Sequence, residues 1–416
     1  MAIASSSRQD AARPALARSL TLVHATLYGL GVTIGAGIYV LVGAAAARGG
    51  MHAPLAFVIA AVLMALSAAS FAELASRFPV AAGEAAYARA AFRSPKLALV
   101  VGLLVVSIAV VSAAAISVGS AGYVAVFVDL PLPLLAVAIV IAMGITAAWG
   151  IKQSVTFAAI MTLIEIGGLL VLIVAGLVSD APIVERLPEV IPSPVSPAVL
   201  AGLVSTVLLA VFAFIGFEGL ANIAEEVRKP ERTLPRAIFL TLTIATILYV
   251  AVVWIALVVV EPAELGQSNA PLALVFERLT GASPASMSLI AIVATLNGII
   301  VQIIMASRVL YGLSSQGELP VALAQVHHHT RTPLLATVIT TGLVLALTLA
   351  VPLQHLAELT ARLTLIVFAV VNMSLIALKR RSTDSAGYVA PGWVPWAGAS
   401  SCLGLIALDI WYLLRV

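Results

Sequence analysis

The chain has 416 residues, of which 62% carry hydrophobic side chains and only 10% are charged. Soluble domains average roughly 45–50% apolar and about 25% charged residues. This difference excludes an ordinary soluble enzyme and a disordered chain, and it predicts a polytopic α-helical membrane protein. The single cysteine, Cys402, excludes an intramolecular disulfide framework and a cysteine-based metal cluster.

Eleven apolar runs are long enough to cross a hydrocarbon core, which takes about 20 residues of helix. The runs are continuous, whereas the strands of a membrane barrel show a short alternating pattern. No remaining segment is long and polar enough for a soluble domain, so we expect residues 1–416 to form one transmembrane domain. The predicted spans are 20–46, 53–75, 96–127, 133–150, 155–178, 198–221, 236–260, 285–313, 333–351, 357–378 and 393–414.

The basic residues are unevenly divided between the two sides of these spans. With the N-terminus in the cytoplasm, 17 of the 22 lysines and arginines fall on the cytoplasmic side. The five on the outer side are Arg48, Arg186, Arg278, Arg362 and Arg415. The positive-inside rule therefore predicts a multi-pass protein of the inner (plasma) membrane with a cytoplasmic N-terminus, and it explains the basic balance without a nucleic-acid partner. The acidic, proline-rich segments 180–197 and 261–284 are expected to be ordered external loops.

Glycines cluster inside two of the spans, the first and the sixth. Close packing of helices through small residues is one explanation. The other is a pair of interrupted helices, which in the two halves of a transporter mark its binding site. Spans 1 and 6 are five apart, as inverted repeats at 20–178 and 198–378 would place them, with 393–414 as an additional span. The glycines are Gly29, Gly31, Gly35, Gly37 and Gly43 in span 1, and Gly216 and Gly219 in span 6.

Broken half-helices expose free N–H and C=O groups at the depth of the membrane centre. The N–H groups attract a carboxylate, and the freed carbonyl groups attract an ammonium group or a cation. A zwitterionic amino acid matches both ends at once.

Four stretches resemble the amino acid–polyamine–organocation permeases, a family that includes cationic amino acid transporters and bacterial amino acid permeases. Span 1 contains I-G-A-G-I at 34–38. From Gly216 the chain reads G-F-E, followed by E-E-V-R-K-P-E-R-T-L-P-R-A, which is the most specific match. Span 8 ends in S-R-V-L-Y-G-L-S-S-Q-G-E-L-P, and span 10 also fits the family. The family usually has a twelfth span, which is missing here.

The resemblance implies a leucine-transporter-type fold of 5+5 inverted repeats, with spans 1 and 6 broken, that works by alternating access. Carried over by position, the backbone of Ile34, Gly35, Ala36 and Gly37 would bind the substrate carboxylate. Thr33 and the backbone of Phe212 and Ile215 would face the amino group, with Phe212 as an aromatic gate. Ala36, Ala213 and Ile215 make the expected pocket small and apolar, which favours a small or aliphatic neutral side chain.

Two acidic residues lie deep within spans, Glu165 and Glu218. Such residues are costly in hydrocarbon and are candidates for function. Glu165 stands where several proton-coupled members of the family carry a lysine. We predict that Glu165 carries the coupling proton, with sodium binding or a structural hydrogen bond as alternatives. Glu218 is either a second proton carrier or a cap of the broken span 6.

The predicted function is therefore secondary active transport of an L-amino acid, with a proton as the expected coupling ion. No Walker motif is present to use ATP, and the motifs of a membrane-embedded enzyme are also missing. We expect an amino acid substrate and the lipid bilayer as partners, and no cofactor or metal. A cationic amino acid or polyamine exchanger and a non-transporting sensor on the same fold remain alternatives, and the oligomeric state is open.

Overall fold

The fold is known from a computed structural model that describes residues 18–78, 83–150, 155–381 and 387–414. These residues form an all-helical structure, with one isolated bridge between Leu20 and Val227. The side chain of Ala36 and four residues of the predicted charge pattern, Arg8, Arg13, Lys152 and Arg415, lie outside the described part.

Eleven long helices correspond one to one with the predicted spans. The helices are α1 (Leu22–Gly49), α2 (Ala53–Arg77), α4 (Pro95–Val124), α5 (Leu132–Trp149), α6 (Val155–Val178), α7 (Pro197–Phe214), α8 (Pro230–Val259), α11 (Ala285–Ser315), α12 (Leu334–Ala350), α13 (Leu353–Arg381) and α14 (Val394–Leu413). Among the described residues, nine stretches are long and apolar enough to cross a membrane. One of them, Gly37–Arg77, contains the second part of α1 together with α2, and the shorter apolar stretches Leu22–Gly35 and Leu334–Ala350 are the first part of α1 and α12.

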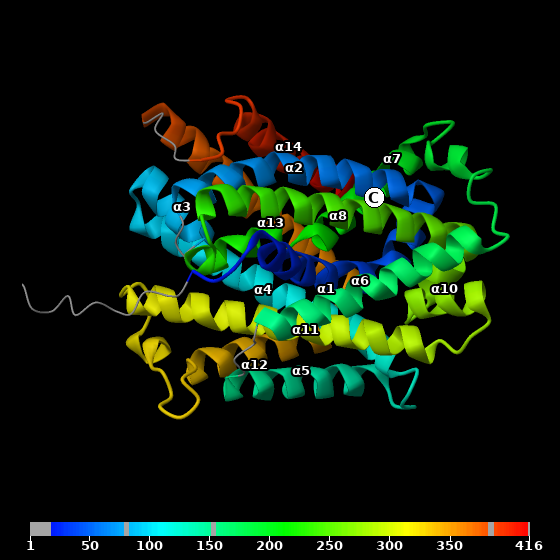
Figure 1. Ribbon diagram of the computed structural model, residues 1–416, viewed down its shortest axis with the longest axis horizontal. Helices are drawn as coiled ribbons and strands as arrows, with labels where there is room; N and C mark the ends of the chain where they lie inside the picture. Colours follow the sequence, from blue (N-terminus) through cyan, green and yellow to red (C-terminus); the bar gives the residue numbers. More distant parts are fainter. Residues whose placement is uncertain (1–17, 79–82, 151–154, 382–386, 415–416) are drawn as a thin grey trace, which may run out of the picture.

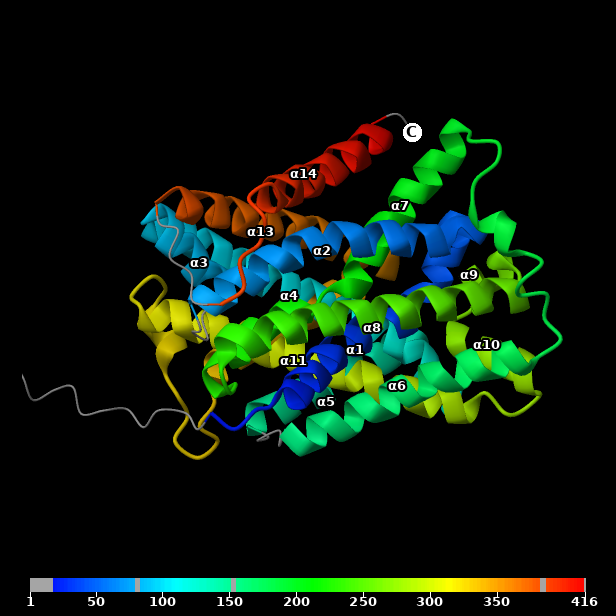
Figure 2. The same ribbon diagram turned by 45° about the horizontal axis from the view of Figure 1, so that its top comes forward.

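Short helices lie at the two ends of the bundle, and we call these the α3 end and the α10 end (Figures 1 and 2). The α3 end carries α3 (Gly83–Phe92), which was not predicted, and η4 (Val321–Ala324). The α10 end carries η1 (Gly50–His52), η2 (Leu187–Val190), α9 (Pro262–Gln267) and α10 (Pro271–Thr280). The segments 180–197 and 261–284 therefore contain ordered structure, as expected for them.

Local sequence signals set where several spans begin. The Ser94 hydroxyl accepts a hydrogen bond from the N–H of Leu97 (3.3 Å) and caps α4, and Ser196 caps α7 in the same way through Val199 (3.2 Å). A proline follows each cap, where its missing N–H and its restricted φ suit the first turn.

The two predicted breaks have different outcomes. Span 6 is interrupted as predicted, because α7 ends at Phe214 and the chain continues as the 3-10 helix η3 (Phe217–Glu226). The prediction for span 1 is wrong in this conformation, since α1 is helical from Leu22 to Gly49. Glycine lowers helix propensity by only about 1 kcal/mol relative to alanine, so neighbouring helices can hold such a segment helical.

Four of the five pairs of helices at matching places in the two predicted halves lie against each other. The pairs α1–α7, α2–α8, α4–α11 and α5–α12 are all in contact. A pseudo-twofold relation between the halves would produce such pairing. The inverted repeats, with their boundaries at 20–178 and 198–378, stay a prediction.

The additional span α14 packs on α13 and α2 through buried polar contacts. Asn372 of α13 donates to Ser67 (3.0 Å) and accepts from Ser70 (2.6 Å), and both serines belong to α2. Gly398 of α14 lies so close to this amide that an added Cβ would be 2.5 Å from the Asn372 Oδ1 atom. At the α10 end, Arg362 of α13 pairs with Asp409 of α14 (2.7 Å). The C-terminal span is therefore an integral part of the bundle.

Candidate functional site

The break in span 6 is built around Gly216. Ile215 has extended backbone angles, and Gly216 has a φ of 134°, which side-chain-bearing residues rarely adopt. An added Cβ at Gly216 would also lie 2.7 Å from the backbone nitrogen of Thr33 on α1. Both the turn and the close approach of α1 therefore require glycine at this position.

The glycines of α1 lie in tight contact with two other helices. An added Cβ at Gly37 would overlap the Cα atom of Ala213 on α7. An added Cβ at Gly35 would lie 2.8 Å from the carbonyl oxygen of Ala294 on α11 and 3.6 Å from the Glu165 carboxylate. The close-packing explanation of these glycines thus holds for the present conformation, and a substrate between α1 and α7 requires that the two helices separate.

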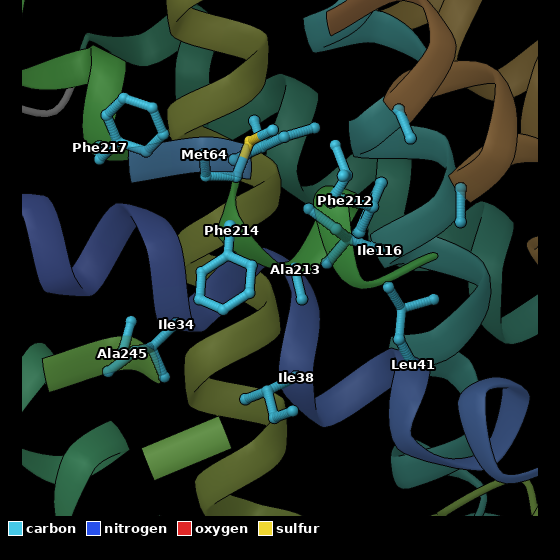
Figure 3. Close-up of a cluster of buried hydrophobic side chains, with 14 of the residues drawn as sticks. Ile34, Ile38, Leu41, Met64, Ile116, Phe212, Ala213, Phe214, Phe217 and Ala245 are labelled. Atoms are coloured by element: carbon cyan, nitrogen blue, oxygen red, sulfur yellow. The ribbon is translucent and has the colours of Figure 1, made fainter. Parts of the chain in front are cut away.

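The predicted substrate-binding residues gather in one place in the middle of the bundle. Figure 3 shows Ile34 of α1 and Phe212 and Ala213 of α7 together in one buried cluster. Thr33, Ile34, Phe212, Ala213 and Ile215 are each at most 2% exposed. The structure thus brings together the parts of spans 1 and 6 that the sequence singled out.

Two aromatic residues just before the break, Phe212 and Phe214, have distinct surroundings. Phe212 lies beside Ile116 of α4, whereas the ring of Phe214 lies on the other side, near Ile34 (Figure 3). Phe214 packs edge-on against Phe57 of α2 (6.3 Å between centroids) and against Tyr249 of α8 (5.2 Å). Phe214 was not predicted as a site residue, although its place two residues before Gly216 was a usable signal.

Tyr249 was not predicted either, because its role depends on a contact with a different helix. Its hydroxyl donates to the carbonyl oxygen of Thr33 (2.9 Å), which ties α8 to α1 beside the break. The Thr33 Oγ1 atom is itself buried and has no hydrogen-bond partner among the described residues.

Glu165 is fully buried where α6 meets α1 and α11. Its Oε1 atom accepts a hydrogen bond from the amide of Asn297 on α11 (3.2 Å), and its Oε2 atom has no partner within the described structure. The Tyr39 hydroxyl donates to the backbone carbonyl of Glu165 (2.6 Å). Asn297 was not predicted, because nothing in its local sequence indicates that it faces a carboxylate on another span.

Glu218 takes part in different contacts from Glu165. Its Oε2 atom accepts a hydrogen bond from the N–H of Gly216 (2.9 Å), which is the capping interaction expected at the break. The same side chain lines a small cavity that faces α3, α4 and α13. The two predicted coupling residues thus lie in separate surroundings.

Comparison with known proteins shows which family of proteins this chain belongs to. The family model described as amino acid permease matches residues 20–413, which is nearly the whole chain. The chain belongs to the amino acid permease family.

Three relatives show the range of this family. The chain is 30% identical to the branched-chain amino acid permease BcaP of Bacillus subtilis (strain 168), over 94% of this chain and 88% of the relative. It is 25% identical to the methylthioribose transporter of the same organism, over 93% and 87%. It is 29% identical to the vacuolar cationic amino acid transporter 4 of Arabidopsis thaliana, over 93% and 66%. All three relatives are named as permeases or transporters.

Ion pairs tie the helices of this permease together at both ends. At the α10 end, Glu358 of α13 pairs with Arg48 at the end of α1 and with Arg362 (3.3 Å). At the α3 end, the buried Glu73 of α2 pairs with Lys379 of α13 (2.8 Å) and accepts the N–H of Ala390 (2.8 Å). In the described conformation, ion pairs therefore join α13 to α1 at one end of the bundle and to α2 at the other.

Proposed function

We propose that the permease is a secondary active transporter that imports L-amino acids by alternating access, together with a proton. The observation that carries this proposal is the break of α7 at Gly216, in contact with the glycine-rich part of α1. Irregular backbone at membrane depth is tolerated where it lines a binding cavity or is buried in protein.

Substrate binding requires a local change in α1. In the described conformation the N–H groups of residues 34–37 belong to a continuous helix and are not free for a carboxylate. Gly35 and Gly37 lower the free energy needed to unwind this turn, since each is about 1 kcal/mol less favourable in a helix than alanine. We therefore expect the turn at 34–37 to open when α1 separates from α7.

The walls of the site favour a small or aliphatic neutral side chain. Ile34, Phe212, Ala213 and Ile215 are apolar and buried at the break. The relative BcaP is named for branched-chain amino acids, which agrees with such walls. A cationic substrate is the second candidate, because other relatives are named as cationic amino acid transporters.

The carboxylates of Glu165 and Glu218 each already accept a hydrogen bond within the protein. Glu165 accepts from Asn297, and Glu218 accepts from the N–H of Gly216. A cationic side chain would have to compete with these contacts, so we favour the neutral substrate.

Glu165 is the proposed carrier of the coupling proton. An acidic side chain at this depth costs on the order of 2.5–3.5 kcal/mol when it is charged, even on lenient insertion scales. Protonation removes this cost. The Oε1 atom lies 3.6 Å from where a Cβ at Gly35 would be, so the charge on Glu165 and the position of α1 affect each other. One proton can thus bias the orientation of the site.

The coupling is tested by uptake into proteoliposomes with imposed pH or sodium gradients. Wild type is expected to concentrate substrate on a pH gradient, and Glu165→Gln is expected to lose this accumulation while it still exchanges substrate. Glu277→Gln serves as a control, because this carboxylate is exposed on α10 at the end of the bundle. Accumulation by Glu165→Gln at the wild-type level would contradict the assignment, and accumulation on a sodium gradient would assign sodium instead.

The substrate class is tested by counterflow with a panel of amino acids. Leucine, valine and alanine are expected to drive counterflow of one another, and arginine and lysine are expected to be weak. Counterflow with cationic amino acids alone would support the cationic exchanger. Binding without counterflow would support a sensor on the same fold.

The proposed location is the plasma membrane, with the α3 end in the cytoplasm. Most of the basic residues that the structure describes fall at the α3 end, which suits the inner side of a membrane.

A further inference from the structure

Two carboxyl groups from distant parts of the chain face one small cavity near the α3 end. Glu84 lies on α3, and Glu218 lies on η3 just after the break. Both line a small cavity of about 20 Å³, together with Thr364 and Phe368 of α13 and apolar residues of α4. This space is of the size that one water molecule occupies.

Among the residues that the structure describes, no basic side chain lines this cavity. Facing Glu84 are Tyr87 from α3 itself, Glu218 from η3, Thr364 from α13, Met305 from α11 and only apolar residues from α4. Three basic residues of the neighbouring segments have partners elsewhere, whereas Arg93 and Lys96 follow α3 at its C-terminal end and do not line the cavity. Arg89 pairs with Glu318, Lys379 pairs with Glu73, and Arg381 donates to the carbonyl of Ala91 (2.7 Å).

The surroundings favour a neutral Glu84. Its side chain belongs to a residue that is only 9% exposed, and burial raises the pKa of the Glu84 carboxyl to about 7. Two carboxylates that share a small cavity also repel each other, so the pair holds a proton more readily than either group alone. Glu218 stays oriented toward the cavity while it accepts the N–H of Gly216.

We propose that Glu84 and Glu218 form a second protonation site, which shares one proton while the α3 end is closed and opens that end when the proton leaves. The proposal rests on the transport function proposed above, and it adds a residue and a step that the coupling by Glu165 does not contain. With the shared proton bound, the pair carries a single negative charge and the two side chains can lie beside the same cavity. When the proton leaves, two negative charges push η3 away from α3.

The packing around the pair shows what this repulsion would move. Phe217, next to Glu218, packs edge-on against Phe71 (5.8 Å) and Phe368 (5.5 Å), and Phe71 also packs against Tyr87 (6.3 Å). These rings join α2, α3, η3 and α13 around the cavity. Separation of the two carboxylates therefore loosens the same contacts that close the α3 end.

The first test is an infrared titration of the purified protein, which follows the stretching band of protonated carboxyl groups and needs no transport. Wild type is expected to lose such a band around pH 7. Glu84→Gln and Glu218→Gln are each expected to remove this transition, whereas Glu165→Gln and Glu277→Gln are expected to keep it. A transition that persists in both Glu84→Gln and Glu218→Gln would overturn the shared site.

The second test asks whether the proton controls opening. Thr364→Cys places a thiol in the cavity wall, in a Cys402→Ser background that removes the one native cysteine. Its rate of modification by a small thiol reagent is expected to rise several-fold from pH 6 to pH 8 beyond the rise of a free thiol. Adding Glu84→Gln is expected to flatten this rise, and Glu84→Asp is expected to retain it. An unchanged rise with Glu84→Gln would overturn the gating role.

The two proposals can fail independently. If counterflow is missing but the infrared transition depends on Glu84 and Glu218, the transport function fails and the proton site stands. If counterflow is present and the transition does not depend on the pair, the transport function stands and this inference fails.

Discussion

Gly37 shows how one missing side chain sets the distance between two helices. A Cβ at this position would overlap the backbone of Ala213, so α1 and α7 can touch only because the residue is glycine. In the described conformation Gly37 therefore allows α1 and α7 to pack closely. In the proposed substrate-bound conformation it lowers the free energy needed to unwind this turn of α1.

Gly37→Val is expected to abolish transport, and Gly37→Ala is expected to reduce it strongly, because both side chains force α7 away from α1. Gly342→Ala on α12 is the matched control, since an added Cβ there meets nothing within 4 Å. Substrate affinity and uptake are measured on protein that elutes as a single species in size-exclusion chromatography. Wild-type affinity in Gly37→Val would refute a binding site at span 1.

Phe212 is expected to close the site over its substrate. Phe212→Ala should weaken substrate binding or increase leak, because the site loses an apolar lid and stays wet. The residue is 1% exposed, and truncation of a buried phenylalanine costs about 3–5 kcal/mol in soluble proteins. Thermal stability must therefore be measured alongside affinity and leak. Phe212→Trp keeps a large ring, and if both variants behave as wild type, Phe212 is only a packing residue.

At the scale of elements, α7 and η3 are one span with an obligatory break. The sequence indicated this break through Gly216 and Gly219, and the structure assigns the two glycines different parts. Gly216 has the positive φ and touches Thr33, whereas an added Cβ at Gly219 would meet only Val32, at 3.8 Å.

Gly216→Ala is expected to lower both thermal stability and transport, because a non-glycine residue at such a φ costs about 1–3 kcal/mol. Gly219→Ala is expected to remain close to wild type, since its added methyl group makes an ordinary contact. Melting temperature in detergent and uptake rate check both variants. Equal effects of the two substitutions would show that the break does not depend on the backbone angle at Gly216.

Over the whole molecule, the α3 and α10 ends differ in charge and in loop structure, which predicts the orientation in the membrane. Cysteines introduced as Ala282→Cys and Gln325→Cys lie at exposed positions at the α10 and α3 ends, respectively. A membrane-impermeant thiol reagent on intact cells is expected to label Ala282→Cys and to spare Gln325→Cys. The native Cys402 is buried and gives little background. The reverse labelling pattern would invert the proposed topology.

The sequence by itself determined the eleven spans, the break in span 6 and the placement of the site residues within their spans. Continuous apolar runs, prolines and helix caps act within a few residues of chain, so they are readable without the fold. Apolar runs bounded by charge located most of the long helices to within a few residues, although α8 begins at Pro230 rather than 236 and α7 ends at Phe214 rather than 221. The helix α3 was missed because it is short and its sequence is not a membrane span.

Only the tertiary structure decided which residues meet. The continuity of α1 depends on its contacts with Ala213 and Ala294, and the surroundings of Glu165 depend on Asn297 of a helix more than 130 residues away. The pairing of Glu84 with Glu218 arises in the same way, across one cavity. Such contacts between distant segments follow from how the helices pack, and no local pattern of residues encodes them.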